Sequence, residues 1–266
     1  MFRALVLALA AALAAPAAHA EGTAGIVSAE LLPGWRGADG AHVTALRLTL
    51  APGWKTYWRA PGAAGIAPLF DWAGSRNVRA VHLHWPRPKL FTLGGLRTLG
   101  YARELILPMQ VVPERPGAPI HLAASVDLGV CRDICVPASL TVSADLPAPG
   151  APDAAIGAAL AARPETAAEA GVRGHGCRVA ATPEGLRVTA EVEVPSLGTG
   201  EMVVIETADS ALWVSETQSE RRGGRVTAVA DIVPLGGGPV ALDRRGLTIT
   251  LLSEGRAVEL SGCPAR

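Results

Sequence analysis

Two cysteines separated by three residues, Cys131 and Cys135, are the side chains whose type and spacing best suit a chemical reaction. Thiolates are nucleophiles and soft metal ligands, so a neighbouring pair can exchange with a disulfide or bind a soft metal ion. A fully extended chain would hold their Cα atoms about 13 Å apart, whereas a disulfide needs about 4.4–6.8 Å. If this pair forms a disulfide, the chain must therefore turn between them. The apolar run 120–130 before the pair and Val-Pro after it predict a tight hairpin or a one-turn loop at a strand end.

A disulfide across three residues would be a weak staple, because closing a short loop removes little entropy from the unfolded chain. The spacing of Cys131 and Cys135 therefore favours a redox or metal-binding role, and a local clip on a turn stays an alternative. A closed zinc site would need two further ligands, and no second Cys or His pair has zinc-finger spacing. Cu(I) needs only the two thiols and also stays open.

The other two cysteines, Cys177 and Cys263, bracket the second half of the chain. Four cysteines allow three pairings, and the simplest one keeps each bridge within its own half. A bridge between Cys177 and Cys263 would close a loop of about 87 residues and stabilise the fold by about 4–5 kcal/mol on the chain-entropy model. We predict that this pair forms a structural disulfide.

The N-terminal residues 1–20 have the features of a cleaved signal peptide: Arg3, an apolar stretch 4–15 and Ala-His-Ala at 18–20. The apolar stretch is shorter than the ~20 residues of a membrane span, and no later stretch is long enough. We therefore expect an exported protein that does not span a membrane, in a compartment that permits disulfides. The Ala-, Gly- and Arg-rich composition favours the bacterial periplasm. A net charge of +0 gives no indication of a nucleic-acid partner.

Alternation of apolar and polar residues predicts an all-β protein, and 30 Gly and 21 Pro argue against a mainly helical one. Turn signals about every ten residues are typical of β-sandwiches. We predict two sandwich domains, 21–147 and 171–266, joined by a Pro/Ala-rich linker and a short helix within 148–170, with Asp153 as its N-cap. The predicted strands lie within 26–50 and at 105–112, 120–130, 140–146, 177–182, 185–194, 202–207, 225–233, 240–242 and 246–252.

Several sequence blocks in the first half occur in the order seen in a known family. The sequence resembles the N-terminal periplasmic region of DsbD-type thiol:disulfide interchange proteins, most closely the ScsB branch linked to suppression of copper sensitivity. The resemblance covers roughly residues 25–145 and rests on GWKTYWRxPG at 53–62, FDWxGSxNV at 70–78, WP at 85–86, GY at 100–101 and CRDICVP at 131–137. It implies an immunoglobulin-like β-sandwich whose active dithiol is Cys131 and Cys135.

The resemblance also implies partners and a protective loop. In the family, which is also associated with cytochrome c biogenesis, this domain takes electrons from a membrane-embedded domain and passes them to periplasmic thioredoxin-fold proteins. A mobile cap loop shields the dithiol. Residues 90–101 combine three glycines with apolar side chains, so this segment is our candidate cap, with Phe91 or Tyr101 as the lid. The family pattern favours Cys135 as the cysteine that bonds the client, although the residues alone leave the order open.

Full-length members of the family continue into a multi-helix membrane domain and a thioredoxin-like domain, whereas this sequence stops at Arg266. We therefore expect a membrane-embedded electron donor in trans. The expected function is a periplasmic electron-relay module that needs no cofactor and performs protein-disulfide reductase-type exchange through Cys131 and Cys135. Two alternatives are a periplasmic Cu(I)-binding protein of copper tolerance and a non-catalytic interaction module.

Overall fold

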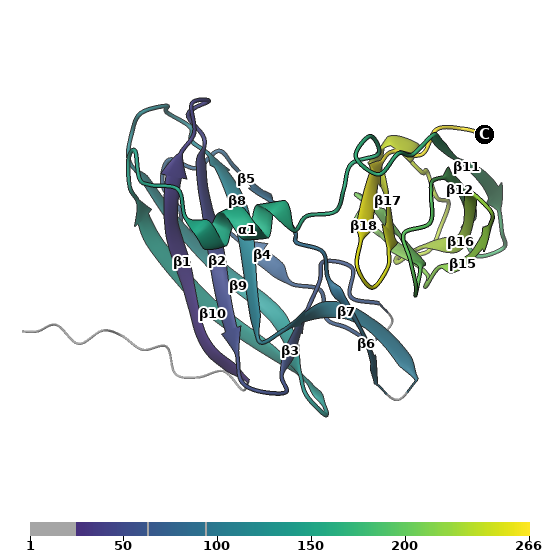
Figure 1. Ribbon diagram of the computed structural model, residues 1–266, viewed down its shortest axis with the longest axis horizontal. Helices are drawn as coiled ribbons and strands as arrows, with labels where there is room; N and C mark the ends of the chain where they lie inside the picture. Colours follow the sequence, from purple (N-terminus) through teal and green to yellow (C-terminus); the bar gives the residue numbers. More distant parts are fainter. Residues whose placement is uncertain (1–24, 63, 94) are drawn as a thin grey trace, which may run out of the picture.

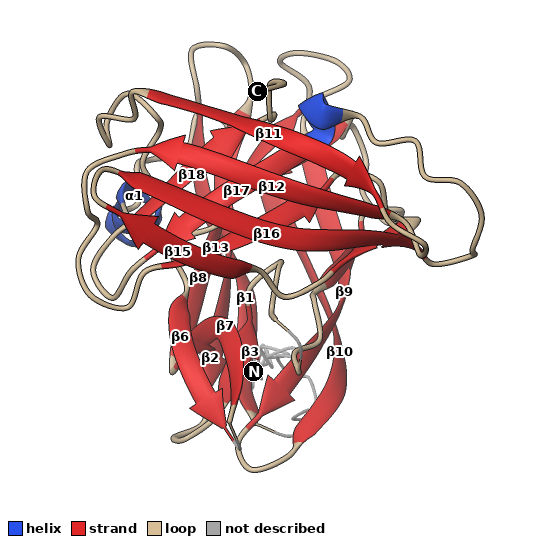
Figure 2. Ribbon diagram, turned by 90° about the vertical axis from the view of Figure 1, so that its right-hand side faces the viewer, coloured by secondary structure: helices blue, strands red, loops and turns tan. Residues whose placement is uncertain are grey.

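Antiparallel β-sheets dominate the molecule (Figures 1 and 2). The computed structural model describes residues 25–62, 64–93 and 95–266, and the predicted signal peptide lies outside them. The strands and their pairing confirm the prediction of an all-β fold. The proposed division into domains at residues 147 and 171 stays a prediction. Below, "first half" means residues 25–147 and "second half" means residues 171–266.

The first half consists of two facing antiparallel sheets. One has the order β1 (Ile26–Arg36), β2 (His42–Leu50), β8 (Glu104–Val112) and β5 (Ala80–Leu83). The other has the order β10 (Cys135–Leu146), β9 (Ile120–Cys131), β3 (Lys55–Tyr57), β7 (Leu96–Ala102) and β6 (Lys89–Leu93), and β4 (Leu69–Asp71) also pairs with β9. Buried side chains of both sheets meet in a single core cluster. Two packed antiparallel sheets of this kind are the arrangement of an immunoglobulin-like sandwich.

The long hairpin of β9 and β10 positions the predicted dithiol. Alternate β9 residues from Ile120 to Val130 point into the core and are buried, which is the period of a strand with one face on a core. β9 and β10 pair without a register shift from Leu146 opposite Ile120 to Cys135 opposite Cys131. The buried pattern fixes the register because a slip of one residue would move the core side chains to the solvent face.

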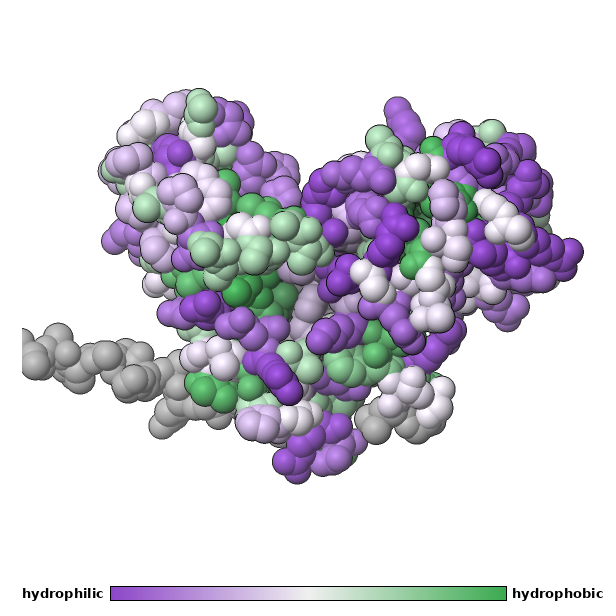
Figure 3. Space-filling view, viewed as in Figure 1, coloured by the Kyte–Doolittle hydropathy of each residue, from purple (hydrophilic) through white to green (hydrophobic). Residues whose placement is uncertain are grey.

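The segment between the halves contains the predicted helix, α1 (Ala154–Ala161). The Asp153 carboxylate accepts hydrogen bonds from the backbone N–H groups of Ala155 and Ile156, so this residue is the N-cap, as predicted. Ile156 is fully buried and packs in a small cluster with Leu32 of the first half. The helix is therefore fixed on the first sandwich, and its small outward residues give the apolar colour of that surface in Figure 3.

The second half also has two facing sheets. One has the order β11 (Gly174–Ala181), β12 (Leu186–Glu193), β16 (Arg225–Pro234) and β14 (Leu212–Val214), and β15 (Gln218–Arg222) also pairs with β16. The other has the order β13 (Met202–Thr207), β17 (Leu247–Leu252) and β18 (Ala257–Ser261), and the 3-10 turn η1 (Arg244–Gly246) precedes β17. The predicted strand at 240–242 is wrong, because these residues have no strand pairing.

A disulfide joins Cys177 of β11 to Cys263, which follows β18, with Cα atoms 5.5 Å apart. Both cysteines are buried in the core of the second half. The bridge links the first strand of this half to the last residues of the chain, so it closes almost the whole of the second half into one loop.

The two halves are in contact, and Figure 3 shows them as two lobes that meet below a notch. Leu252 and Ala257, from the β13–β17–β18 sheet, are buried in the core cluster of the first half, and Met202 packs against it. The guanidinium of Arg59, in the first half, binds the carboxylates of Glu206 at 2.9 Å and Glu259 at 2.5 Å. Apolar and ionic contacts therefore both hold this face of the second half against the first.

Candidate functional site

Cys131 and Cys135 face each other across the end of the β9–β10 hairpin. Cys131 is the last residue of β9 and Cys135 the first of β10, and the two are direct partners in the ladder. Directly opposed residues of an antiparallel pair have Cα atoms about 4.5–5.5 Å apart, which is within the range of a disulfide. Both are free thiols in this structure. The predicted tight hairpin is confirmed, and it brings the two sulfur-bearing residues into bonding range.

The two thiols differ in their access to solvent. Cys131 is fully buried, with 0% of its surface exposed, while Cys135 is exposed. β3 pairs with the end of β9 and places Lys55 opposite Cys131, which covers that side of the buried cysteine. The disulfide of another protein can therefore reach Cys135 first. The buried Cys131 lies next to Cys135, where it can attack the Cys135 sulfur.

The phenol of Tyr57 lies in hydrogen-bond contact with the dithiol. Its oxygen is 2.7 Å from the Sγ of Cys135, and the Tyr57 side chain is 1% exposed. Burial and the neighbouring thiols raise the pKa of Tyr57 well above its ordinary value of 10. The phenol therefore stays protonated across the physiological range. When Cys135 is a thiolate, the phenol must be the donor and stabilises the charge.

Two glycines make room for the Tyr57 ring. A Cβ on Gly65 would lie 2.9 Å from one ring carbon, and a Cβ on Gly129 would lie 2.9 Å from another. Such contacts are closer than carbon atoms tolerate, so any larger residue would displace the ring. The Gly129 carbonyl also accepts a hydrogen bond of 2.9 Å from the hydroxyl of Thr56, which ties β3 to β9 beside the cysteines. The position of the phenol is thus set by close backbone packing.

Burial raises the pKa of the Cys131 thiol above its ordinary value, and the neighbouring Cys135 acts in the same direction. The hydrogen bond from Tyr57 and the positive charge of Lys55 oppose this rise. Cys131 therefore stays protonated at neutral pH as long as Cys135 is an unbonded thiol. Tyr57 and Lys55 favour the Cys131 thiolate, which is the form that Cys131 needs in order to attack a disulfide.

The tip of the hairpin, residues 132–134, carries a compensated ion pair and an exposed apolar side chain. Arg132 donates to the carboxylate of Asp133 at 2.9 Å and lies over the Trp54 ring at 5.9 Å. The opposite charges of Arg132 and Asp133 thus largely neutralise each other. Ile134 is 73% exposed between the two cysteines. An apolar side chain therefore faces solvent beside Cys135.

The candidate cap, residues 90–101, is a hairpin of β6 and β7 rather than a loop, and β7 pairs with β3. The Lys55 ammonium lies 5.0 Å from the centre of the Phe91 ring, so Phe91 covers the residue opposite Cys131. Tyr101 is different. It is 7% exposed, donates to the Pro86 carbonyl at 2.7 Å and stacks on Trp85. Its assignment as a lid is wrong, because a packed and hydrogen-bonded core residue cannot swing over the dithiol. Phe91 stays the candidate.

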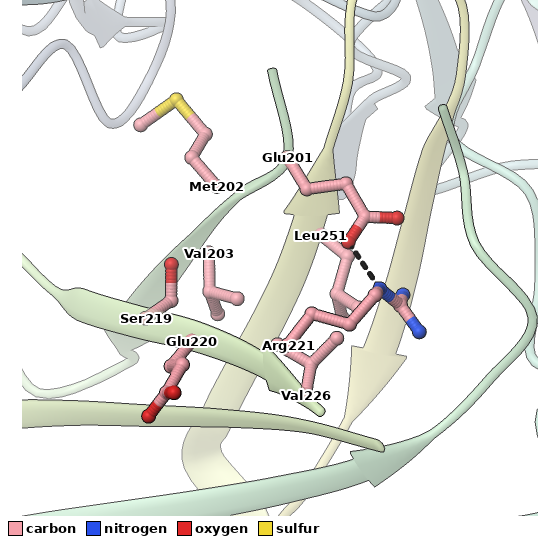
Figure 4. A pocket seen from close by; sticks show the side chains of 8 residues that line it. All are labelled: Glu201, Met202, Val203, Ser219, Glu220, Arg221, Val226 and Leu251. Carbon is pink, nitrogen blue, oxygen red and sulfur yellow. Dashed lines mark hydrogen bonds and ion pairs between the residues drawn. The ribbon is translucent and has the colours of Figure 1, made fainter. Parts of the chain in front are cut away.

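Other parts of the described structure offer less chemistry. Within residues 25–62, 64–93 and 95–266, no three His, Cys, Asp or Glu side chains cluster as a metal site. The cavity in Figure 4, in the second half, has a volume of ≈ 80 Å³ and contains no thiol. Its main polar groups, Glu201 and Arg221, bind each other and are therefore already satisfied. In the same part of the chain, no helix combines the length and the hydropathy that crossing a bilayer requires.

Sequence reasoning singled out both cysteines of this candidate site but did not assign Tyr57 or Lys55 to it. The aromatic segment 51–62 was a recognisable sequence block, yet its residues are distant from Cys131 along the chain. Only the pairing of β3 with β9 brings them together. The available signal was therefore the family block at 53–62, and no spacing rule connects it to the cysteines.

Comparisons with known proteins agree with this geometry. The model of the family "Thiol:disulfide interchange protein DsbD, N-terminal" matches residues 28–147. The solved N-terminal periplasmic domain of ScsB from Proteus mirabilis is 22% identical, with a TM-score of 0.63 over 90% of this chain and 92% of that one. The reduced DsbD N-terminal domain of Neisseria meningitidis is 16% identical over 48% of this chain and 87% of that one. Its TM-score of 0.27 supports no argument about fold. A comparison with curated proteins gives no significant match.

The family match covers the whole β9–β10 hairpin, with both opposed cysteines, and β3, with Tyr57. The similarity to the ScsB domain extends over both halves and concerns the fold. Residues 28–147 therefore match the model of DsbD-type N-terminal domains of thiol:disulfide interchange proteins, in a chain whose fold is similar to that of the ScsB periplasmic domain.

Proposed function

We propose that the protein is a periplasmic electron-relay module that exchanges its Cys131/Cys135 dithiol with disulfides of thioredoxin-fold proteins. One observation supports this above all: an exposed Cys135 is hydrogen-bonded to a buried phenol and lies directly opposite a buried Cys131. An exposed nucleophile with a second thiol behind it is the arrangement that disulfide exchange requires. The family match supports the same chemistry and the same class of partner.

The exchange has two steps. The Cys135 thiolate attacks one sulfur of the partner's disulfide, a mixed disulfide forms, and the partner's second sulfur leaves as a thiolate that takes up a proton. Cys131 then loses its proton and attacks the Sγ of Cys135, which breaks the mixed disulfide and releases the reduced partner. Two electrons and two protons have passed to the partner, and Cys131 and Cys135 are joined. The Lys55 charge and the Tyr57 phenol favour the Cys131 thiolate of the second step.

The oxidised module must be reduced again before another cycle. We propose that a membrane-embedded thiol protein supplies these electrons in trans. The exposed Cys135 supports this proposal, because a donor can form a mixed disulfide with it by the same route in reverse. Periplasmic location is part of the proposal and is supported by the family match and by the buried disulfide of the second half.

A redox titration of the mature protein, with free thiols trapped and located by peptide mass, tests the proposal. We expect the Cys131/Cys135 pair to equilibrate well above about −300 mV, while the buried Cys177–Cys263 bridge stays closed. The Cys135→Ser variant is the control and should lose the transition. If both pairs resist reduction down to that potential, the interchange function fails.

Cu(I) binding is the second candidate. It is favoured by the close opposition of two thiols, because Cu(I) accepts two soft ligands and needs no third. A copper-binding protein would retain one Cu(I) per chain through dialysis against a weak competitor, and Cys131→Ser would lose it. Retention that survives this substitution would exclude the dithiol as the copper site.

A further inference from the structure

A groove lies between the two halves of the molecule. Its volume is ≈ 540 Å³, within the range of roughly 300–1,000 Å³ typical of binding pockets. The first half contributes residues 59–62, 65 and 67 together with Arg97 and Leu99. The second half contributes all of β13 and residues 212–217. Residues of both halves therefore form the walls of the groove.

The second-half wall of the groove is built from strands at the edges of their sheets. Among the described strands, β13 pairs with β17 on one side only, and β14 is the last strand of the opposite sheet. An edge strand presents unpaired N–H and C=O groups that an incoming extended segment can use. Because every residue of β13 lines the groove, a segment that lies in the groove runs along this open edge.

The side chains of the groove favour an apolar ligand. Trp213 is 53% exposed, and large exposed aromatic residues are typical anchors of protein interfaces. The charged groups are already paired: Arg59 binds Glu206 at 2.9 Å, and Arg97 binds Glu216 at 2.7 Å. Little net charge is left to attract a charged ligand, so recognition falls to backbone hydrogen bonds and to Trp213.

One loop borders both the dithiol and the groove. The carbonyl oxygen of Ala64 lies 4.0 Å from the Sγ of Cys135, and Gly65 packs against the Tyr57 ring. The same loop lines the groove at Gly62 and Gly65. A protein whose sulfur is bonded to Cys135 would therefore lie beside the loop that lines one side of the groove.

We propose that this groove binds an extended, mainly apolar segment of the thioredoxin-fold partner, which adds along β13 and packs on Trp213. The inference rests on the proposed function and gives the second half a role in it: partner selection. A small disulfide has no such segment, so its reaction at Cys135 does not depend on the groove.

The first step of the test isolates the partner. In the Cys131→Ser variant the mixed disulfide with Cys135 cannot be resolved, so a partner stays attached and can be identified by mass spectrometry. We expect a thioredoxin-fold protein. Failure to trap one in the periplasm of the producing cells, while the variant still reacts with oxidised glutathione, would overturn the proposed function and the groove assignment together.

The second step measures reduction of the purified partner by the unmodified dithiol. We expect Trp213→Ala to slow this reaction about tenfold, as loss of an interface anchor does, and to leave the reaction with oxidised glutathione unchanged. Leu235→Ala is the matched control. Leu235 is 69% exposed in the same half and does not line the groove. An unchanged rate in Trp213→Ala, or an equal loss in Leu235→Ala, would overturn the groove assignment and leave the interchange function intact.

Hydrogen exchange of the trapped complex gives an independent readout. Addition of a segment to β13 should slow exchange of amides within Met202–Thr207 relative to the free protein, because open-edge groups gain partners. Protection confined to the β9–β10 hairpin would overturn strand addition.

Discussion

Removal of one oxygen atom, by Tyr57→Phe, tests whether the buried phenol activates the dithiol. The phenol oxygen is 2.7 Å from the Cys135 Sγ, and the ring stays packed between Gly65 and Gly129 in the variant. Hydrogen bonds to charged groups contribute about 1.5–3 kcal/mol. We use the lower value, about 1.5 kcal/mol, because Cys135 is exposed and water competes for its thiolate. A loss of about 1.5 kcal/mol limits the fall in the reaction rate of the dithiol to about 13-fold.

The alkylation rate should fall by less than this limit. A hydrogen bond that stabilises the charge on the sulfur also lowers its nucleophilicity, and with a Brønsted coefficient of about 0.4–0.5 roughly half of the loss on a logarithmic scale is recovered. We therefore expect alkylation at neutral pH to slow about fourfold.

The assay is alkylation by iodoacetamide at neutral pH in the Cys131→Ser background, where Cys135 is the reactive thiol and the Cys177–Cys263 bridge is closed. Tyr101→Phe is the matched control. It also loses a buried phenol, but one that donates to the Pro86 carbonyl. An unchanged rate in Tyr57→Phe, or an equal loss in Tyr101→Phe, would refute activation by the phenol.

Three further predictions concern the same molecule. In Cys135→Ser, Cys131 should alkylate more slowly than Cys135 does in Cys131→Ser. Its rate should rise only above the ordinary thiol range near pH 8.5, because burial, the largest cause of its raised pKa, remains; a midpoint at or below that range would contradict the argument. Phe91→Ala should speed alkylation of the reduced dithiol at least about twofold, since the cation–π contact with the buried Lys55 is worth at least ~0.5 kcal/mol; an unchanged rate would remove Phe91 as the lid. Replacing Cys177 and Cys263 by Ala should lower the free energy of unfolding, measured with urea, by about 4–5 kcal/mol while leaving dithiol alkylation unchanged.

Strands that bury one face were predictable, because burial imposes a period of two on the sequence. The run 120–130 became β9 (Ile120–Cys131), and the prediction for 202–207 agrees with β13 (Met202–Thr207). β15 (Gln218–Arg222) escaped prediction because its side chains are mostly exposed and polar, so only backbone pairing with β16 makes it a strand. The short apolar run at 240–242 misled for the opposite reason: it has hydrophobic residues but no strand beside it.

The residues of the candidate site also include some that the sequence predicts and some that it does not. Cys131 and Cys135 are local in sequence, so their spacing and the residues on either side of them predicted the turn that makes them direct partners in the ladder. The contact of Tyr57 with Cys135 depends on two strands that meet only in the folded sheet. No local pattern records that pairing. The lid assignment of Tyr101 failed because the glycines before it suggested pliability, whereas the β3–β7 pairing holds Tyr101 in the core.

The two halves are in contact next to β3, the strand that carries Tyr57. Tyr57 ends β3, and two residues later Arg59 packs over the Trp58 ring at 4.6 Å and binds Glu206 and Glu259 of the second half. Trp58 is fully buried, so this short segment cannot shift without disturbing the core. The second half therefore holds the chain next to Tyr57 in place, in addition to forming one wall of the groove. Because the phenol activates Cys135 only at hydrogen-bond distance, a contact that fixes β3 also supports the chemistry of the dithiol.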